Sequence, residues 1–185
     1  HMWTPDVYTG APTPVTALMA GCVKVAAFGA LLRVFNVGLE SSAWDWHTIL
    51  MVIAVATMIG GAIFAVTQRN IKRLLAYSSV ANAGYLLIGV IALGDAVGQT
   101  MFYLAAYGFT VIAAFAVVSL VRDGDEEATH LSRWAGLGKN SPGVAAIFTV
   151  FMLALVGIPF TSGFTAKFSL FSAGLEAGEV GLVIV

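Results

Sequence analysis

The chain has 185 residues, of which 59% are hydrophobic and only 10% carry a formal charge, against roughly 25% in a typical soluble domain. Nine basic and ten acidic residues give a net charge of −1, so no basic surface for nucleic acid is expected. The single cysteine, Cys22, excludes an internal disulfide and a cysteine-based metal site. This composition excludes an ordinary soluble enzyme and a disordered chain, and it predicts an integral membrane protein in contact with the lipid bilayer.

Five apolar stretches are each long enough to cross a bilayer core, which needs about 20 helical residues. In chain order they are Pro14–Phe35, Thr48–Gln68, Leu74–Gly94, Ala96–Val121 and Ser141–Ala166. A sixth apolar run begins at Val180, close to the last residue given. We therefore expect residues 1–185 to form a single membrane-domain fragment with about five transmembrane helices and the start of a sixth. The predicted fold class is all-α, a polytopic transmembrane helix bundle.

The segments outside these spans are predicted to be connectors. Residues 1–13 carry X-Pro turn signals and no apolar core, and residues 122–140 hold four closely spaced acids, which is typical of a solvated loop. Basic residues fall in alternate connections, after the second and fourth spans. By the positive-inside rule, residues 69–73 and 122–140 are expected on the cytoplasmic side.

Lys24 is the first residue that indicates a function. It is the eleventh of the 22 residues of the first span, so it lies about 15 Å from either helix end, near the bilayer midplane. A lysine there costs roughly 2.5–3.5 kcal/mol on insertion scales and cannot easily reach the interface. Every acid in the chain falls in a connection or at the end of a span. We interpret Lys24 as a proton-transfer residue; the alternative is a lysine that pairs with a neighbouring helix for packing.

The fifth span contains a predicted helix break at Gly157, Pro159 and Gly163. Pro159 cannot donate a backbone hydrogen bond to the carbonyl of Leu155, and broken helices of this kind place free carbonyls beside ions in transporters. Lys167 follows the break, where those carbonyls favour a bound cation. We predict that Lys167 is a second proton-transfer residue. The alternative is a simple proline kink with this lysine near the membrane interface.

Polar side chains recur on one face of the third span and on one face of the fourth, at spacings of three and four residues. They are Ser78, Asn82 and Tyr85 on the third span, and Tyr103, Tyr107 and Thr110 on the fourth. We call these six residues the polar seam. The seam is predicted to hold water that supports proton transfer, or to form interhelical hydrogen bonds worth about 0.6 kcal/mol each.

The sequence has no Gly-rich dinucleotide loop, no P-loop, no cysteine cluster and no pair of histidines placed for haem. We therefore expect no redox cofactor, no metal and no catalytic residue on this chain. Close helix contacts are predicted at Gly60, Gly61, Gly84 and Gly89, because glycine lets neighbouring backbones approach.

Three motifs resemble those of the antiporter-like subunits of proton-pumping NADH:quinone oxidoreductase, respiratory complex I. They are residues 1–15, with Trp3-Thr4-Pro5-Asp6-Val7-Tyr8, residues 68–85, from Gln68-Arg69-Asn70 to Gly84-Tyr85, and residues 157–168, which end in Lys167-Phe168. The resemblance implies helices eight to twelve of a fourteen-helix fold. It matches Lys24 with the family's central lysine of helix eight and Lys167 with the lysine of its broken helix twelve. The family's glutamate of helix five and lysine of helix seven would precede residue 1.

The resemblance also implies a proton-translocating subunit of a translocase in a bacterial plasma (inner) membrane, with the other membrane subunits of the complex as partners. NADH, flavin, iron–sulfur clusters and quinone would be bound by other subunits. Where sibling subunits carry titratable residues on helix eleven, this chain has Tyr103, Tyr107 and Val111. The alternatives are a subunit of a multisubunit Na⁺/H⁺ antiporter or of a membrane-bound hydrogenase, and a purely structural membrane subunit.

Overall fold

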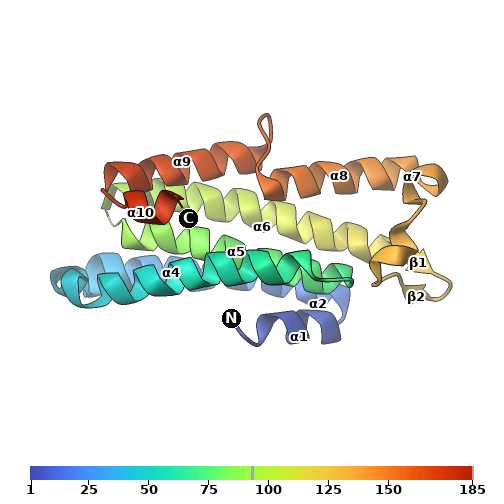
Figure 1. Ribbon diagram of the computed structural model, residues 1–185, viewed down its shortest axis with the longest axis horizontal. Coiled ribbons are helices and arrows are strands. Elements are labelled where there is room, and N and C mark those ends of the chain that lie inside the picture. Colours follow the sequence, from blue (N-terminus) through green and yellow to red (C-terminus); the bar gives the residue numbers. More distant parts are fainter. Residues whose placement is uncertain (93, 185) are drawn as a thin grey trace.

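The computed structural model describes residues 1–92 and 94–184, apart from the side chain of Asp95. Its three longest helices have 21 to 24 residues and are α4 (Ala43–Val66), α5 (Ile71–Ile91) and α6 (Val97–Leu120). They run along the long axis of the molecule, and the shorter helices α8 (Pro142–Val156) and α9 (Ser162–Glu176) lie end to end beside α6 (Figure 1). The predicted all-α helix bundle, discontinuous near Pro159, is confirmed.

The first predicted span is one helical segment whose hydrogen-bond pattern changes along its length. It consists of α2 (Thr13–Leu18), the π-helical turn η1 (Met19–Val23), α3 (Lys24–Arg33) and a second π-helical turn, η2 (Val34–Gly38). Its 26 residues are long and apolar enough to cross a membrane, as are residues 40–66, 71–91 and 97–120. The sequence predicts this span but not its π turns, because hydropathy does not determine to which carbonyl each backbone N–H donates its hydrogen bond.

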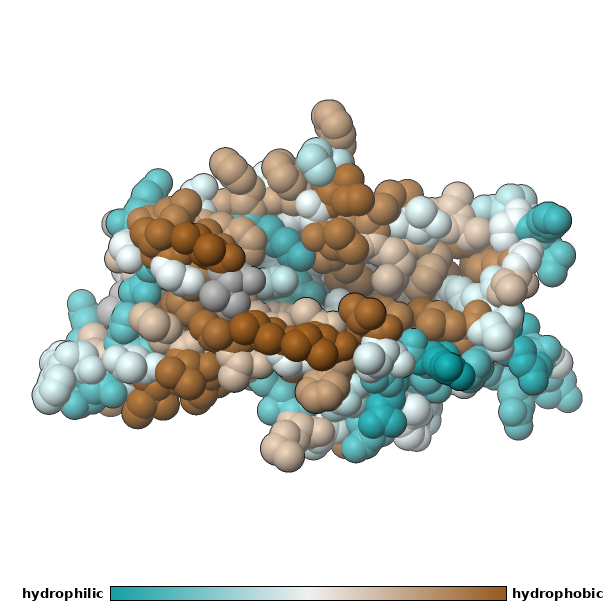
Figure 2. Space-filling model, in the orientation of Figure 1, coloured by the Kyte–Doolittle hydropathy of each residue, from teal (hydrophilic) through white to brown (hydrophobic). Residues whose placement is uncertain are grey.

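Large apolar side chains cover much of the outer surface. Figure 2 shows them in brown along the length of the visible face, with hydrophilic residues in teal mainly toward its ends. The helix α4 exposes Ile49, Val52, Ile53, Ile59, Ile63, Phe64 and Val66. The helix α5, in contrast, is central, and Ala76, Ala83, Leu86, Ile88 and Val90 on it are fully buried. An exposed surface this apolar suits lipid or further membrane helices rather than water.

The two basic connections meet at one end of the bundle, as the alternation of charge predicts. Asn70 and His130 form an antiparallel bridge there, which joins the start of α5 to the segment after α6. At the opposite end the backbone N–H of Gly94 donates to the Asn36 side-chain oxygen at 2.8 Å. Because helices of this length connect the two ends, the loops are separated as membrane-spanning helices require.

Two segments that were predicted to be simple connectors are folded. Residues Thr4–Gly10 form the helix α1, because Pro5 occupies the first turn, where the missing backbone N–H costs nothing. The loop after α6 is largely exposed, as predicted for a solvated connector, but it forms a hairpin and short helices. Its elements are β1 (Arg122–Asp123), β2 (Glu126–Glu127), η5 (Leu131–Trp134) and α7 (Leu137–Asn140). Three further short helices lie elsewhere in the described chain: η3 (Glu40–Ser42), η4 (Gly94–Ala96) and α10 (Val180–Ile184).

Close helix contacts are present at three of the four predicted glycines. A Cβ atom at Gly61 would press on the backbone of Ala81, and Cβ atoms at Gly84 and Gly89 would overlap neighbouring side chains. The prediction for Gly60 is wrong, because that position faces open space. Neighbouring residues of a helix point about 100° apart, so only one of two consecutive glycines lies at this contact.

Candidate functional site

Lys24 lies in the middle of the first span, the twelfth of its 26 residues, directly after the π-helical turn η1. Its Nζ donates to the carbonyl and the hydroxyl oxygen of Ser79, both at 2.5 Å, and to the hydroxyl of Tyr107 at 3.4 Å. Ser79 on α5 and Tyr107 on α6 are both buried. A π turn re-aims the side chain that follows it, and such turns are frequent at functional sites. The lysine is thus held by neutral oxygens from two other helices.

The predicted helix break separates α8 from α9. The helix α8 ends at Val156, and Gly157 follows it in the left-handed conformation with φ 86°. The loop that contains Pro159 projects from the bundle (Figure 1). The second half begins at Ser162, where the Thr161 hydroxyl accepts a hydrogen bond from a backbone N–H of the first turn. Both ends of the break therefore carry ordinary helix caps.

Lys167 reaches back from α9 to the end of α8. Its Nζ donates to the carbonyl oxygens of Leu155 at 2.8 Å and Val156 at 3.1 Å, and it lies 5.0 Å from the ring centroid of Tyr85. The Leu155 carbonyl is the one that Pro159 was predicted to leave without its backbone donor. The predicted proximity of this lysine to the freed carbonyls is therefore confirmed.

The two halves of the polar seam face each other between α5 and α6. The Tyr103 hydroxyl donates to the side-chain oxygen of Asn82, whose Nδ2 donates in turn to the Ser78 carbonyl at 2.8 Å. The rings of Tyr103 and Tyr107 are stacked, with centroids 6.2 Å apart. Because Tyr103 is only 2% exposed, these polar groups lie in the interior of the protein. Thr110 donates to its own helix, at Ala106, and makes no bridge to α5 through that bond.

A small cavity lies where the polar seam meets the broken helix. Its volume is about 10 Å³, close to the least that can hold one water. It is lined by Asn82, Tyr103, Ala106, Tyr107, Thr110, Ala154, Leu155, Gly163 and Lys167. A second cavity of about 260 Å³ is bordered by Ser78, Asn82 and Tyr85 and is also lined by Lys167. The structure thus brings all six residues of the polar seam to the surroundings of Lys167, and Tyr107 also contacts Lys24.

Glycine at position 163 is required by the packing of the two half-helices. A Cβ atom there would overlap the carbonyl oxygen of Ala154, in the last two turns of α8. This close approach brings the start of α9 against α8 and places Lys167, four residues later, within reach of the freed carbonyls. The three predicted break residues therefore act at different points: Gly157 ends α8, Pro159 lies in the loop, and Gly163 permits the contact.

Ion pairs among the described side chains lie near helix ends, and none of them includes Lys24 or Lys167. They are His47–Glu179, Lys72–Glu127, Arg73–Asp6 and Arg133–Asp123. Over the described residues, no cluster of three or more histidine, cysteine or acidic side chains could hold a metal ion. The two central lysines are bound by carbonyl and hydroxyl oxygens instead.

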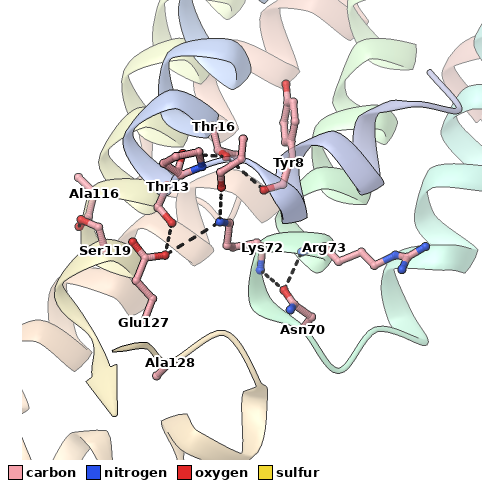
Figure 3. Close-up of polar contacts among 12 residues, drawn as sticks. Tyr8, Thr13, Thr16, Asn70, Lys72, Arg73, Ala116, Ser119, Glu127 and Ala128 are labelled. Carbon is pink, nitrogen blue, oxygen red and sulfur yellow. Dashed lines mark hydrogen bonds and ion pairs between the residues drawn. The ribbon is translucent and has the colours of Figure 1, made fainter. Parts of the chain in front are cut away.

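The sequence did not predict that Lys72 is buried. Lys72 is only 4% exposed; its Nζ donates to the Ala11 carbonyl at 2.7 Å and lies 4.0 Å from a Glu127 carboxylate oxygen, which also accepts from the Thr13 hydroxyl (Figure 3). The sequence does contain a signal that α5 begins before Lys72, because Asn70 is a favourable N-cap residue. Its side chain accepts hydrogen bonds from the first backbone N–H groups of α5, so Lys72 belongs to the helix rather than to the loop.

The entire chain matches one protein family. The family described as "NADH:quinone oxidoreductase/Mrp antiporter, TM" covers residues 1–185. The chain belongs to this family. Among its relatives in the NADH:quinone oxidoreductase/Mrp antiporter family, the "NADH-quinone oxidoreductase subunit N" of Salinispora arenicola (strain CNS-205) is 66% identical over 185 residues, which are 100% of this chain and 36% of that protein. The chain thus spans about a third of that relative's length.

Two solved structures of membrane complexes contain chains that are similar to this one in sequence and fold. A chain of respiratory complex I from Thermus thermophilus is 37% identical, with a TM-score of 0.84, and the match covers 100% of this chain and 40% of that one. A chain of the Mrp complex from Dietzia sp. DQ12-45-1b is 30% identical, with a TM-score of 0.90, and 34% of it is covered. The fold is therefore common to both branches of the family.

Proposed function

We propose that this chain is part of subunit N of a proton-translocating NADH:quinone oxidoreductase in a bacterial plasma membrane. The 66% identity of the whole chain to a protein of that name supports this assignment. Residues 1–185 form one membrane-domain segment, with other membrane subunits of the complex as partners. The segment contributes a path for protons, whereas NADH, flavin, iron–sulfur clusters and quinone are bound by other subunits.

The observation that carries the proposed path is that Lys24 and Lys167 border one buried polar seam. The Lys24 Nζ lies 3.4 Å from the hydroxyl of Tyr107, and Tyr107 lines the same small cavity as Lys167. That cavity has room for about one water. Tyr103 and Asn82 complete its wall and are held by their mutual hydrogen bond. Two lysines, one hydroxyl and one water therefore suffice to connect the two sites.

One transfer along this path moves a proton from Lys24 to Lys167. An N–H bond of the Lys24 ammonium breaks as the Tyr107 oxygen accepts the proton, and the Tyr107 hydroxyl releases its own proton to the water. The water in turn passes a proton to the neutral amine of Lys167. Lys24 ends as an amine and Lys167 as an ammonium, so the number of protons and the total charge are unchanged.

The surroundings of each lysine support both of its protonation states. The carbonyls of Leu155 and Val156 bind the Lys167 ammonium, and the carbonyl and hydroxyl of Ser79 bind that of Lys24. Removal from water acts in the opposite direction and favours the neutral amines. These opposed effects allow a lysine to exchange its proton instead of holding it permanently.

A second candidate function is cation–proton antiport, which the TM-score of 0.90 to a chain of the Mrp complex favours. This alternative predicts proton movement that depends on Na⁺ and needs no quinone. A hydrogenase-type complex predicts proton movement driven by hydrogen oxidation or evolution. A purely structural role predicts that both lysines tolerate methionine, because an unbranched apolar side chain would fill the same space.

The experiment that tests the proposed function measures NADH-driven proton uptake by inverted membrane vesicles that contain the full complex. Lys24→Ala is expected to lower proton uptake strongly, while the assembled complex and its NADH-to-quinone electron transfer persist at least in part. Lys139→Ala is the matched control, because Lys139 is exposed in α7 and far along the chain from both lysines. Normal proton uptake in the Lys24→Ala complex would refute the proposed path.

A further inference from the structure

Three acceptors surround the Nζ of Lys24, one for each N–H bond of its ammonium. They are the carbonyl oxygen and the hydroxyl oxygen of Ser79, both at 2.5 Å, and the hydroxyl oxygen of Tyr107 at 3.4 Å. A neutral amine has two N–H bonds and one lone pair, so after proton loss one of these neighbours must donate to the nitrogen. A carbonyl has no proton to donate, whereas a hydroxyl both donates and accepts. Among the described contacts of Lys24, only the hydroxyls of Ser79 and Tyr107 can therefore serve both protonation states.

The hydroxyl of Ser79 is available to Lys24 because it is not bonded to its own helix. Hydroxyls within helices commonly donate to the backbone carbonyl four residues earlier. In this chain Thr100, Thr110 and Thr149 do so, at Ala96, Ala106 and Ala145. Over the described residues, the Ser79 hydroxyl makes no such bond and contacts Lys24 instead. Its proton is therefore free to turn toward the lysine nitrogen.

The two hydroxyls that contact Lys24 line different cavities. Ser79 and Lys24 line a cavity of about 110 Å³, whereas Tyr107 lines the small cavity that it shares with Lys167. A water needs at least roughly 10–15 Å³, so the larger cavity has room for several waters. The other polar residues that line it are His1, Thr4 and Tyr8. Lys24 thus has one hydroxyl on the side of this cavity and the other on the side of Lys167.

We propose that Ser79 is a proton-relay residue, which passes protons from water in the cavity of about 110 Å³ to the amine of Lys24. This inference rests on the proposed function, in which Lys24 gives its own proton to Tyr107. A hydronium ion in the cavity gives a proton to the Ser79 oxygen. The O–H bond that Ser79 held before breaks, and its proton passes to the lone pair of the amine. The hydronium ends as water, the serine again holds one proton, and the lysine becomes an ammonium.

The carbonyl of Ser79 keeps the lysine nitrogen in place during this exchange. It accepts an N–H bond in both protonation states, whereas the hydroxyl changes from acceptor to donor. Both oxygens belong to one residue that is only 1% exposed. The nitrogen therefore stays within reach of the hydroxyl after its proton has left toward Tyr107, and protons enter and leave Lys24 through different hydroxyls.

The test measures the rate of proton uptake by vesicles that contain the assembled complex, with variants at position 79. Threonine and valine have nearly the same shape, but only threonine has a hydroxyl. Ser79→Thr is expected to keep most of the rate, whereas Ser79→Val is expected to lower it by roughly tenfold or more. Valine also fills the space in which a water could replace the hydroxyl. Ser119→Ala is the control, because the Ser119 hydroxyl donates to its own helix, at Ala116 near the end of α6.

The comparison within this pair separates the relay from packing. Equal rates for Ser79→Thr and Ser79→Val, in complexes assembled to the same extent, would overturn the inference. If the added methyl group prevents assembly of both, Ser79→Ala decides, since it removes the hydroxyl and keeps the carbonyl; a normal rate there would overturn the inference. If Lys24→Ala abolishes proton uptake while Ser79→Val pumps normally, only this inference fails. If Lys24→Ala pumps normally, the proposed function fails and the relay falls with it.

Discussion

The Nζ of Lys167 lies 2.8 Å from the carbonyl oxygen of Leu155, an acceptor that the interruption of the helix at Gly157 and Pro159 leaves without its usual backbone donor. A continuous helix would occupy this carbonyl with an N–H group four residues later. The break therefore has a chemical consequence as well as a geometric one. It creates a site for an ammonium group inside the bundle, where the described side chains offer this lysine no carboxylate partner.

Removal of this ammonium should uncouple proton movement from electron transfer. In Lys167→Ala the proposed acceptor is lost, and the carbonyls of Leu155 and Val156 lose their donor. We expect the ratio of protons pumped to electrons transferred to fall, while electron transfer to quinone continues. Simultaneous recording of proton uptake and NADH oxidation in vesicles gives this ratio. An unchanged ratio in a fully assembled complex would remove Lys167 from the path.

Tyr107 should matter more for proton movement than its stacked neighbour Tyr103. Tyr107→Phe removes the hydroxyl that contacts Lys24, and we expect the rate of proton uptake to fall by roughly tenfold or more. Tyr103→Phe removes the donor to Asn82 and should lower the rate less, since that hydroxyl only supports the cavity wall. The two variants change the same atom type on the same helix. Equal rates for both would show that the Tyr107 contact carries no proton.

The contact at Gly163 should be intolerant of any side chain. In Gly163→Ala the added methyl group would overlap the Ala154 carbonyl, so the two half-helices must separate, at a cost of roughly 1–3 kcal/mol or more. We expect a lower yield of assembled complex and a lower Tm in detergent. Gly143→Ala, at the open start of α8, is the control and should leave both unchanged. A normal Tm for Gly163→Ala would mean that the half-helices are not packed this closely.

The buried cluster around Lys72 should contribute to stability. Lys72→Met removes the donor to Ala11 and the partner of Glu127, whose side chain is 28% exposed and so can still reach water. The expected loss is roughly 1–3 kcal/mol, mainly from the unpartnered carbonyl. Thermal unfolding of the purified complex measures this loss, with Lys139→Ala as the exposed-lysine control. Equal Tm values for the two variants would contradict the structural role of Lys72.

Hydropathy and charge were enough to predict four of the five spans, the positions of the two lysines and the helix break. The prediction of a fifth continuous span at Ser141–Ala166 is wrong, because the break divides that segment between the 15-residue helices α8 and α9. Each of the correct predictions depends on the identity of residues within one short segment: a lysine far from any interface, or a proline without an N–H group. The freed Leu155 carbonyl could be named from sequence for the same reason, because it lies four residues before Pro159.

The remaining features depend on how helices rotate against one another, which the sequence pattern does not determine. The bond between Tyr103 and Asn82 needs α5 and α6 in one particular register, and the burial of Lys72 needs α1 and the hairpin to close over it. The prediction of a connector without secondary structure at residues 1–13 was wrong, because Pro5 is compatible with both a turn and the first turn of a helix. The π turn before Lys24 arises from a local change of hydrogen bonding that apolar composition does not reveal.

The most direct test of the proton path compares three complexes: Lys24→Ala, Lys167→Ala and the double variant. Residues that act in series on one path lose their effect once the path is broken, so their effects are not additive. We predict that the double variant has the same ratio of protons to electrons as the more severe single variant. A ratio in the double variant that falls by the sum of the two single losses would mean that the lysines act independently, and it would contradict the proposed transfer between them.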